Sequence, residues 1–177
     1  MTISIMSHYD LFHVSDEDRA RAQAHARFAA AEAARIPDIP ADLPLRPIQR
    51  VAVIGAGTMG GGIAMSLANI GLAVTLIDAH QEGLERGLAR IRDNYATTVK
   101  RGKLSPAEME QRLACISGSI EMAAVKDADM VIEAVFEDMG LKQSIFRQLD
   151  QHCKAGAILA TNTSGLDVDE IAAVTRR

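Results

Sequence analysis

The sequence predicts an α/β protein with a doubly wound parallel sheet, preceded by a helix and a proline-rich linker. Short apolar runs alternate with longer helical segments along residues 50–177, a pattern typical of parallel strands joined by helices. The first apolar run continues directly into a Gly-x-Gly-x-x-Gly segment, which marks a turn from a strand into a helix. Right-handed crossovers then place helices on both faces of the sheet.

The first elements of this sheet lie in the segment VAVIGAGTMGGGIAMSLANIGLAVTLIDA, residues 51–79. Residues 51–54 are apolar and β-branched, as in a buried parallel strand. A helix follows the glycines and ends at Gly71, a typical C-terminal cap. Residues 73–77 form the second strand, so Asp78 is expected at its carboxyl end. The helix residues expected to face the sheet are Ile63, Ala64, Leu67, Ala68 and Ile70.

This segment has the parts needed to hold a dinucleotide. Gly55 permits a tight turn, Gly57 lets the backbone approach a pyrophosphate, and Gly60 lets the helix lie close to the sheet. The helix N-terminus favours the diphosphate charge. Asp78 follows Gly55 by 23 positions, near the roughly 20 expected of an acid that binds the adenosine ribose. Because a carboxylate repels a 2′-phosphate and residues 79–81 contain no arginine, NAD is favoured over NADP. The alternative is that the glycines only cap a helix.

The remaining elements follow in the same alternation. Ser15 with Asp18 resembles a capping box that opens a helix ending near Arg35, and Pro37, Pro40, Pro44 and Pro47 predict an extended linker. The further strands are expected at 115–118, 130–132 and 157–161, and the further helices at 81–103, 106–114, 141–152 and 167–175. The first two of these helices are expected to cover one sheet face. The domains are therefore predicted as residues 1–49 and 50–177.

Composition narrows the classes of partner and location. The 177 residues suit one full-sized domain with an appendage. The net charge of −4 gives no basic field, so nucleic acid and anionic membranes are not expected as partners. No apolar stretch approaches a membrane span, no leader segment is evident, and the expected location is cytoplasmic. Cys115 and Cys153 lack the spacing of a metal site, so no metal is predicted and both are expected in the core.

Ligands of such sheets bind beyond the carboxyl ends of the strands, where the strand order reverses. This rule selects residues 133–137 after the fourth strand and the triplet Asn162, Thr163 and Ser164 after the fifth. Glu137 could accept hydrogen bonds from ribose or nicotinamide, or could be a solvated helix cap. The triplet could equally cap the last helix. Lys142, one turn into a helix, is ordinarily a solvated charge.

Three motifs together resemble the NAD-binding domain of 3-hydroxyacyl-CoA dehydrogenases, a Rossmann-type domain. They are GAGTMGGGIA, VIEAVFED with Lys142, and ATNTSGL. The upstream segment from Arg27 resembles the linker that joins an enoyl-CoA hydratase domain to the dehydrogenase in multifunctional fatty-acid β-oxidation enzymes. The resemblance implies a 3-hydroxyacyl-CoA substrate and a fused or associated hydratase domain, and it leaves homo-oligomerisation open.

The resemblance also implies roles for individual residues. Gly55, Gly57, Met59 and Gly60 would hold the pyrophosphate and Asp78 the adenosine ribose, whereas Val135, Phe136, Glu137 and Lys142 would line the nicotinamide half. Ser164 would hydrogen-bond the 3-oxygen of the substrate, as a catalytic residue beside the nicotinamide. Lys100 and Arg101 match loosely the basic residues that lie near coenzyme A in the family.

The catalytic histidine of the family would follow Ser164 by some twenty residues, whereas this chain stops at Arg177. His8, His13, His25, His80 and His152 are expected at the surface. The chain is therefore expected to be a Rossmann-type domain truncated before the C-terminal helical domain, and inactive alone. Two alternatives stay open, a non-catalytic NAD-binding or interaction module and a different oxidoreductase acting on a small hydroxy acid.

Overall fold

The computed structural model describes residues 15–36, 39–40 and 42–177, and contacts divide the chain into two units, Met1–Arg46 and Pro47–Arg177. The first unit contains the predicted helix as α1 (Asp16–Ala33), whose N-cap Ser15 accepts a hydrogen bond from the Asp18 backbone N–H at 3.1 Å. No residue of α1 is buried. Part of the predicted linker, residues 37–38 and 41, lies outside the described residues, and residues 42–49 form neither helix nor strand.

The second unit, here called the sheet domain, is the predicted doubly wound α/β fold. Its five parallel strands lie in the order β3-β2-β1-β4-β5. The strands are β1 (Arg50–Ile54), β2 (Ala73–Ile77), β3 (Ile116–Ser119), β4 (Met130–Glu133) and β5 (Ile158–Thr161). The helices are α2 (Thr58–Asn69), α3 (Gln81–Lys100), α4 (Pro106–Ala114), α5 (Met139–His152) and α6 (Val168–Ala172), with one 3-10 helix, η1 (Met122–Asp127).

Each predicted strand and helix is present, with bounds that differ by a few residues. The expected helix 81–103 ends earlier, at Lys100, because Gly102 takes a φ of +67° and its N–H bonds the Val99 carbonyl at 2.8 Å. A left-handed glycine after a helix is a common stop. The short helix η1 was not predicted, because its six residues are too few to show a helical period.

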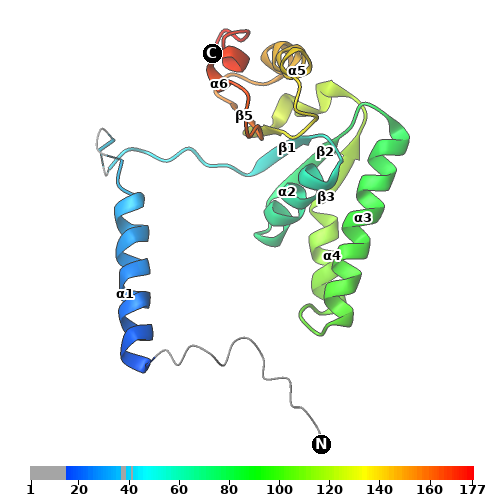
Figure 1. Cartoon of the computed structure of the whole chain (residues 1–177). Helices are drawn as coiled ribbons and strands as arrows, with labels where there is room; N and C mark the ends of the chain where they lie inside the picture. Colours follow the sequence, from blue (N-terminus) through cyan, green and yellow to red (C-terminus); the bar gives the residue numbers. More distant parts are fainter. Residues whose placement is uncertain (1–14, 37–38, 41) are drawn as a thin grey trace, which may run out of the picture. The chain divides into compact units, whose positions relative to one another are not determined.

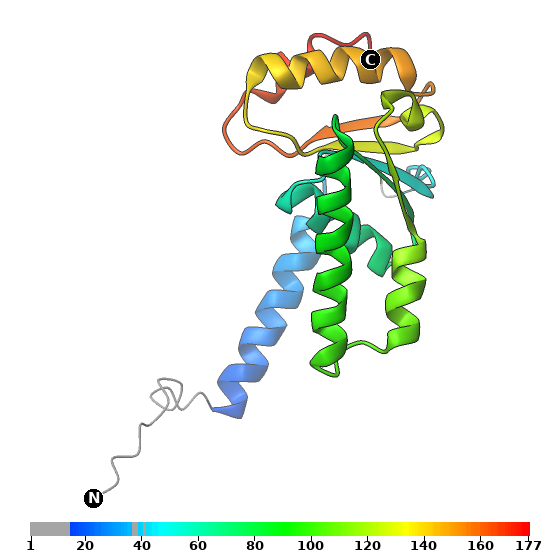
Figure 2. The same ribbon diagram turned by 90° about the vertical axis from the view of Figure 1, so that its right-hand side faces the viewer.

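The helices form one layer on each side of the sheet, as Figures 1 and 2 show, with α2, α3 and α4 on one side and α5 and α6 on the other. Side chains alternate along β1 between these layers. Val53 packs with Leu84 and Ile91 of α3, whereas Ile54 packs with Phe146 of α5. The prediction that helices α3 and α4 cover the same face is confirmed.

Two packing predictions from the sequence are wrong. Ile70 is 74% exposed, because α2 ends at Asn69 and Ile70 is the C-cap beyond the last helical turn. Cys115 is half-buried at the end of α4 and only Cys153 lies in the core. Ala64 and Ala68, by contrast, are buried as predicted.

The strand register brings the carboxyl ends of four strands to one edge. Ile54 pairs with Ile77 on one side and with Glu133 on the other, and Glu133 pairs with Thr161. Because the chain runs from β1 to β2 and β3 and then returns to β4 beside β1, the strand order reverses between β1 and β4. The segments after these strands therefore lie beside one another at the position where such folds bind ligands.

Candidate functional site

The glycine turn after β1 is shaped by close backbone packing. Gly55 has a φ of +104°, and a Cβ there would lie 2.7 Å from the Ala134 carbonyl oxygen. A Cβ on Gly60 would overlap the Gly55 carbonyl. Gly57, in contrast, would place a Cβ in open space, with no atom within 4 Å. Gly55 and Gly60 are therefore required by the fold, whereas Gly57 leaves room for a ligand.

Asp78 lies at the carboxyl end of β2, where the sequence placed it, and its carboxylate holds the glycine turn. Its Oδ2 accepts a hydrogen bond from the Ala56 N–H at 2.9 Å, and its Oδ1 accepts one from the His80 N–H at 3.2 Å. The carboxylate is only half-buried. Asp78 therefore connects the ends of β1 and β2, a structural role that the sequence analysis did not predict.

Helix α3 approaches the glycine turn through two glycines spaced four residues apart. A Cβ on Gly83 would lie 2.6 Å from Asp78 Oδ1, and one on Gly87 would lie 2.5 Å from the Ala56 carbonyl oxygen. No role was predicted for these two glycines. Their spacing, one helical turn, is the signal that could have shown a glycine-lined helix face.

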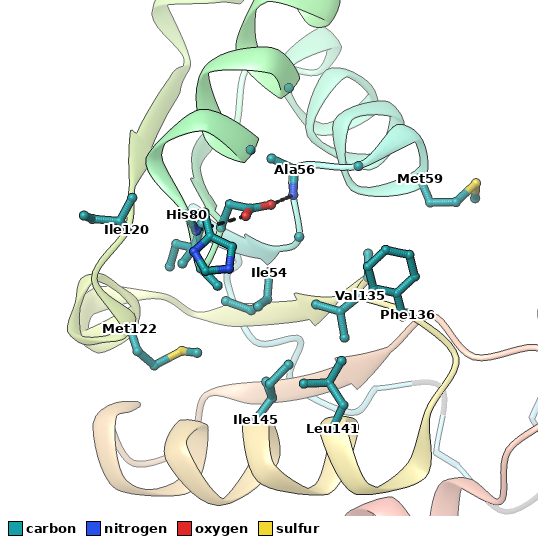
Figure 3. A pocket seen from close by; sticks show the side chains of 18 of the residues that line it. Ile54, Ala56, Met59, His80, Ile120, Met122, Val135, Phe136, Leu141 and Ile145 are labelled. Atoms are coloured by element: carbon teal, nitrogen blue, oxygen red, sulfur yellow. Dashed lines mark hydrogen bonds between the residues drawn. The ribbon is translucent and has the colours of Figure 1, made fainter.

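A cleft of about 940 Å³ lies over this edge of the sheet. Figure 3 shows its wall of apolar side chains, to which Met122 of η1 and Leu141 and Ile145 of α5 contribute. The volume lies in the upper part of the ~300–1,000 Å³ range of small-molecule sites. The predicted site residues that line the cleft are Gly55, Gly57, Met59, Asp78, Val135 and Phe136.

The other predicted site residues, Gly60, Glu137, Lys142 and Ser164, do not line this cleft. Lys142 is fully buried, so the alternative of a solvated surface lysine is wrong. Its Nζ donates to both carboxylate oxygens of Glu133, at 2.8 and 2.9 Å, and lies 3.6 Å from Glu137 Oε2. Because β4 ends at Glu133, this ion pair fastens α5 to the end of the strand.

Glu137 connects the segments that follow β4 and β5. Its Oε1 accepts hydrogen bonds from Thr163 Oγ1 at 2.5 Å and from the N–H groups of Ser164 and Gly165 at 3.0 and 3.1 Å. The Thr163 bond, with the two backbone bonds and the Lys142 charge, lowers the pKa of Glu137 to about 2 despite some desolvation. The carboxylate is therefore ionised at neutral pH.

The capping alternatives for these polar residues are wrong. The N-cap of α5 is Asp138, which accepts from the Leu141 N–H at 2.7 Å, and not Glu137. The N-cap of α6 is Asp167, which accepts from the Asp169 and Glu170 N–H groups, and not the 162–164 triplet. The triplet instead follows β5 beside Glu137, whose carboxylate accepts from Thr163 Oγ1 and from the Ser164 N–H.

Among the described histidines, His80 alone lines the cleft, where its side chain is exposed beside Asp78. His25 of α1 and His152 of α5 are exposed at the surface as expected. His8 and His13 lie outside the described residues. Two arginines that the sequence analysis did not consider, Arg86 and Arg90, also line the cleft.

Among the helices of residues 15–36, 39–40 and 42–177, none is long and apolar enough to cross a bilayer. Within the same residues, no group of three or more His, Cys, Asp or Glu side chains is arranged to hold a metal ion.

Comparison with known proteins identifies the chain by family. Residues 50–177 match the family model described as 3-hydroxyacyl-CoA dehydrogenase, NAD binding domain. A glyoxysomal fatty acid beta-oxidation multifunctional protein of Brassica napus is 36% identical over 160 residues, which cover 90% of this chain and 22% of that protein. A peroxisomal bifunctional enzyme of Danio rerio is 44% identical over 132 residues, covering 75% of this chain and 18% of the relative. The chain thus spans about a fifth of the length of these relatives.

The solved structures of similar fold include proteins that are also named as dehydrogenases. The (S)-3-hydroxybutyryl-CoA dehydrogenase PaaH1 of Ralstonia eutropha is 37% identical with a TM-score of 0.72, covering 74% of this chain and 46% of that one. The dehydrogenase part of multifunctional enzyme 1 from C. elegans is 29% identical with a TM-score of 0.70, covering 80% of this chain and 33% of that one.

These comparisons also correct one prediction. The cytoplasmic location expected from the sequence is contradicted, because the curated relatives are named as glyoxysomal or peroxisomal proteins. Targeting is read by receptors from short signals, and composition does not show it. The predicted fold, NAD as cofactor and the family are confirmed. The chain belongs to the family of 3-hydroxyacyl-CoA dehydrogenase NAD-binding domains.

Proposed function

We propose that the chain is the NAD-binding part of an oxidoreductase that converts L-3-hydroxyacyl-CoA to 3-ketoacyl-CoA in fatty-acid β-oxidation. The observation that carries this proposal is the cleft at the reversal of strand order, lined by Gly57 and Asp78. The residues fit the cofactor, because Gly57 leaves open space at the N-terminus of α2 and the cleft is large enough for a dinucleotide. When bound, NAD supplies the acceptor for the C3 hydride.

We assign the cofactor contacts as the resemblance implies them. Gly55, Gly57, Met59 and Gly60 belong to the pyrophosphate turn, and Asp78 binds the adenosine ribose. Val135, Phe136, Glu137 and Lys142 belong to the nicotinamide side. Support comes from the shared edge of the sheet, since Glu137 accepts from the Ser164 N–H at 3.0 Å and so joins the ends of β4 and β5. Ser164 is exposed there, as a residue that hydrogen-bonds the 3-oxygen of the substrate must be.

We assign different roles to the two parts of the chain. Residues 1–49 are a helix and linker, residues 50–177 bind NAD, and an enoyl-CoA hydratase domain is fused or associated. Support for this partner is that the curated relatives are named as multifunctional or bifunctional proteins. The alternative is an NAD-binding module without catalysis. A histidine-bearing strand encoded downstream of Arg177 at the genetic locus would favour the dehydrogenase over that module.

Binding is tested by calorimetry on the 177-residue polypeptide with NAD and NADP. We expect NAD to bind more tightly, since the Asp78 carboxylate repels a 2′-phosphate. Equal affinity for the two cofactors would contradict the role assigned to Asp78. Absence of NAD binding would contradict the proposed function.

Catalysis is tested by NADH formation with a 3-hydroxyacyl-CoA and excess NAD. We expect no turnover by the 177-residue polypeptide, because His80, the described histidine that lines the cleft, lies at the adenosine end beside Asp78. A positioned general base typically contributes a factor of about 10²–10⁴. Rapid turnover by this polypeptide would contradict the expectation and would identify His80 as the residue to replace next.

A further inference from the structure

Arg90, on the third turn of α3, reaches from the helix to the glycine turn. Its Nη1 donates a hydrogen bond to Thr58 Oγ1 at 3.0 Å, and its side chain lines the cleft. Thr58 directly follows Gly57 and is the first residue of α2. The guanidinium is therefore tethered at the end of the helix where a diphosphate would bind.

Within the part of the chain that the structure describes, no carboxylate balances the positive charge of Arg90. Among the described residues its partner is the neutral Thr58 hydroxyl, and no carboxylate forms an ion pair with it. The neighbouring Arg86 differs, because Glu82 lies 3.6 Å from its guanidinium. Asp78, the acid of the cleft, is directed to the Ala56 and His80 N–H groups. The Arg90 guanidinium can thus bind an anionic ligand in the cleft.

The close packing of α3 against the glycine turn explains how the Arg90 side chain reaches the N-terminus of α2. Gly87, one turn before Arg90, allows α3 to contact the Ala56 backbone, where any Cβ would lie 2.5 Å from the carbonyl oxygen. The N-cap of α2, Gly57, makes no side-chain hydrogen bond, and the first turn of α2 has no acidic residue. Neither the N-cap nor the first turn of α2 therefore supplies a side chain that competes with an anion near Arg90.

We propose that Arg90 is a cofactor-binding residue that donates hydrogen bonds to the diphosphate of NAD, with Thr58 holding its guanidinium in place. The planar guanidinium fork suits phosphate oxygens, and such charge-assisted bonds are stronger than neutral ones. This inference rests on the proposed function. It adds to the glycine turn a cation from a separate element, and the turn itself contains no lysine or arginine.

The test is calorimetry of NAD and NADP binding to the full 177-residue chain and to Arg90→Gln. We expect Arg90→Gln to weaken both cofactors by the same factor, about 10-fold, the lower end of the effect of a hydrogen bond to a charged group. ADP should lose affinity similarly and adenosine should not. Arg90→Lys, which keeps the charge without the fork, should lie between Arg90→Gln and the unmutated chain.

The matched control is Arg92→Gln, on the same helix. Arg92 pairs with Glu110 at 3.2 Å and does not line the cleft, so its loss should leave NAD affinity unchanged. Thermal unfolding of both variants verifies that they fold, as expected for exposed side chains.

Two results overturn the inference while the proposed function stands. One is undiminished NAD affinity of Arg90→Gln beside a chain that binds NAD. The other is a loss confined to NADP, which would place Arg90 at the 2′-phosphate instead of the diphosphate. If the unmutated chain binds no NAD, the proposed function fails and the inference fails with it.

Discussion

Replacing Lys142 by methionine is expected to destabilise the sheet domain by about 3–5 kcal/mol, the usual cost of removing one partner of a buried ion pair. Both Lys142 and Glu133 are fully buried. Without the lysine, Glu133 keeps its bonds from the Val135 N–H at 2.7 Å and Thr161 Oγ1 at 2.5 Å, but loses two charge-assisted bonds and its counter-charge. The carboxylate then stays buried in an uncompensated state, which methionine, although similar in volume, cannot relieve.

The assay is urea unfolding of the unmutated chain, the single variants Glu133→Gln and Lys142→Met, and the double variant Glu133→Gln/Lys142→Met. A neutral amide at position 133 removes the unpaired charge, so the double variant should be at least about 1 kcal/mol more stable than Lys142→Met. Lys126→Met is the matched control, because Lys126 is exposed on η1 and its replacement should cost within about 0.5 kcal/mol. A loss below about 1 kcal/mol for Lys142→Met, or strictly additive effects, would refute this reasoning.

Three further predictions concern the edge of the sheet. Gly57→Val should fold normally yet show no NAD binding by calorimetry. Gly60→Ala should lower the unfolding midpoint, since its Cβ would overlap the Gly55 carbonyl. Equal stability of the two variants would contradict this prediction. Asp78→Ala should narrow the difference between NAD and NADP affinity, with loss of a charged hydrogen bond costing roughly 1.5–3 kcal/mol, and Asp78→Asn, which can still accept from Ala56, should retain more stability. Because the folded-state pKa of Glu137 is lowered to about 2 from 4.5, its stabilisation is present above pH 4.5 and disappears as the pH falls towards 2. The difference in the free energy of unfolding between Glu137→Gln and the unmutated chain should therefore decrease as the pH falls over that range. A difference that stays constant would show that Glu137 does not cause the loss of stability in acid.

The order of strands and helices could be predicted because it depends on local patterns. The run from Val51 to Asp78 contains a strand, a glycine turn, a helix and a second strand, each with its own apolar period or stop residue. The carboxyl ends of parallel strands share one edge. Hence the shared position of Gly55, Asp78 and the segment after β4 is predictable from the sequence. Where a pattern was short, as in η1, the prediction failed.

The environment of single side chains was not predictable from these patterns. Lys142 lies one turn into a helix, at a position where a charged side chain is ordinarily exposed to solvent. It is nevertheless fully buried, because it pairs with Glu133 at the end of β4. Ile70 belongs to the apolar pattern of α2 but lies just beyond its last turn, and is exposed. Both outcomes depend on contacts between elements, which spacing within one element does not contain.

The sequence by itself determined the fold class, the position of the glycine turn and the acid at the end of β2, because backbone conformation and strand periodicity are local properties. The tertiary structure decided which polar groups of separate segments meet. It brought Arg90, 32 positions after Thr58 in the chain, to the glycine turn, and it joined Glu137 to the backbone of Ser164, 27 positions away. Such contacts form only when helices and strands pack, and packing depends on the shapes of both partners at once.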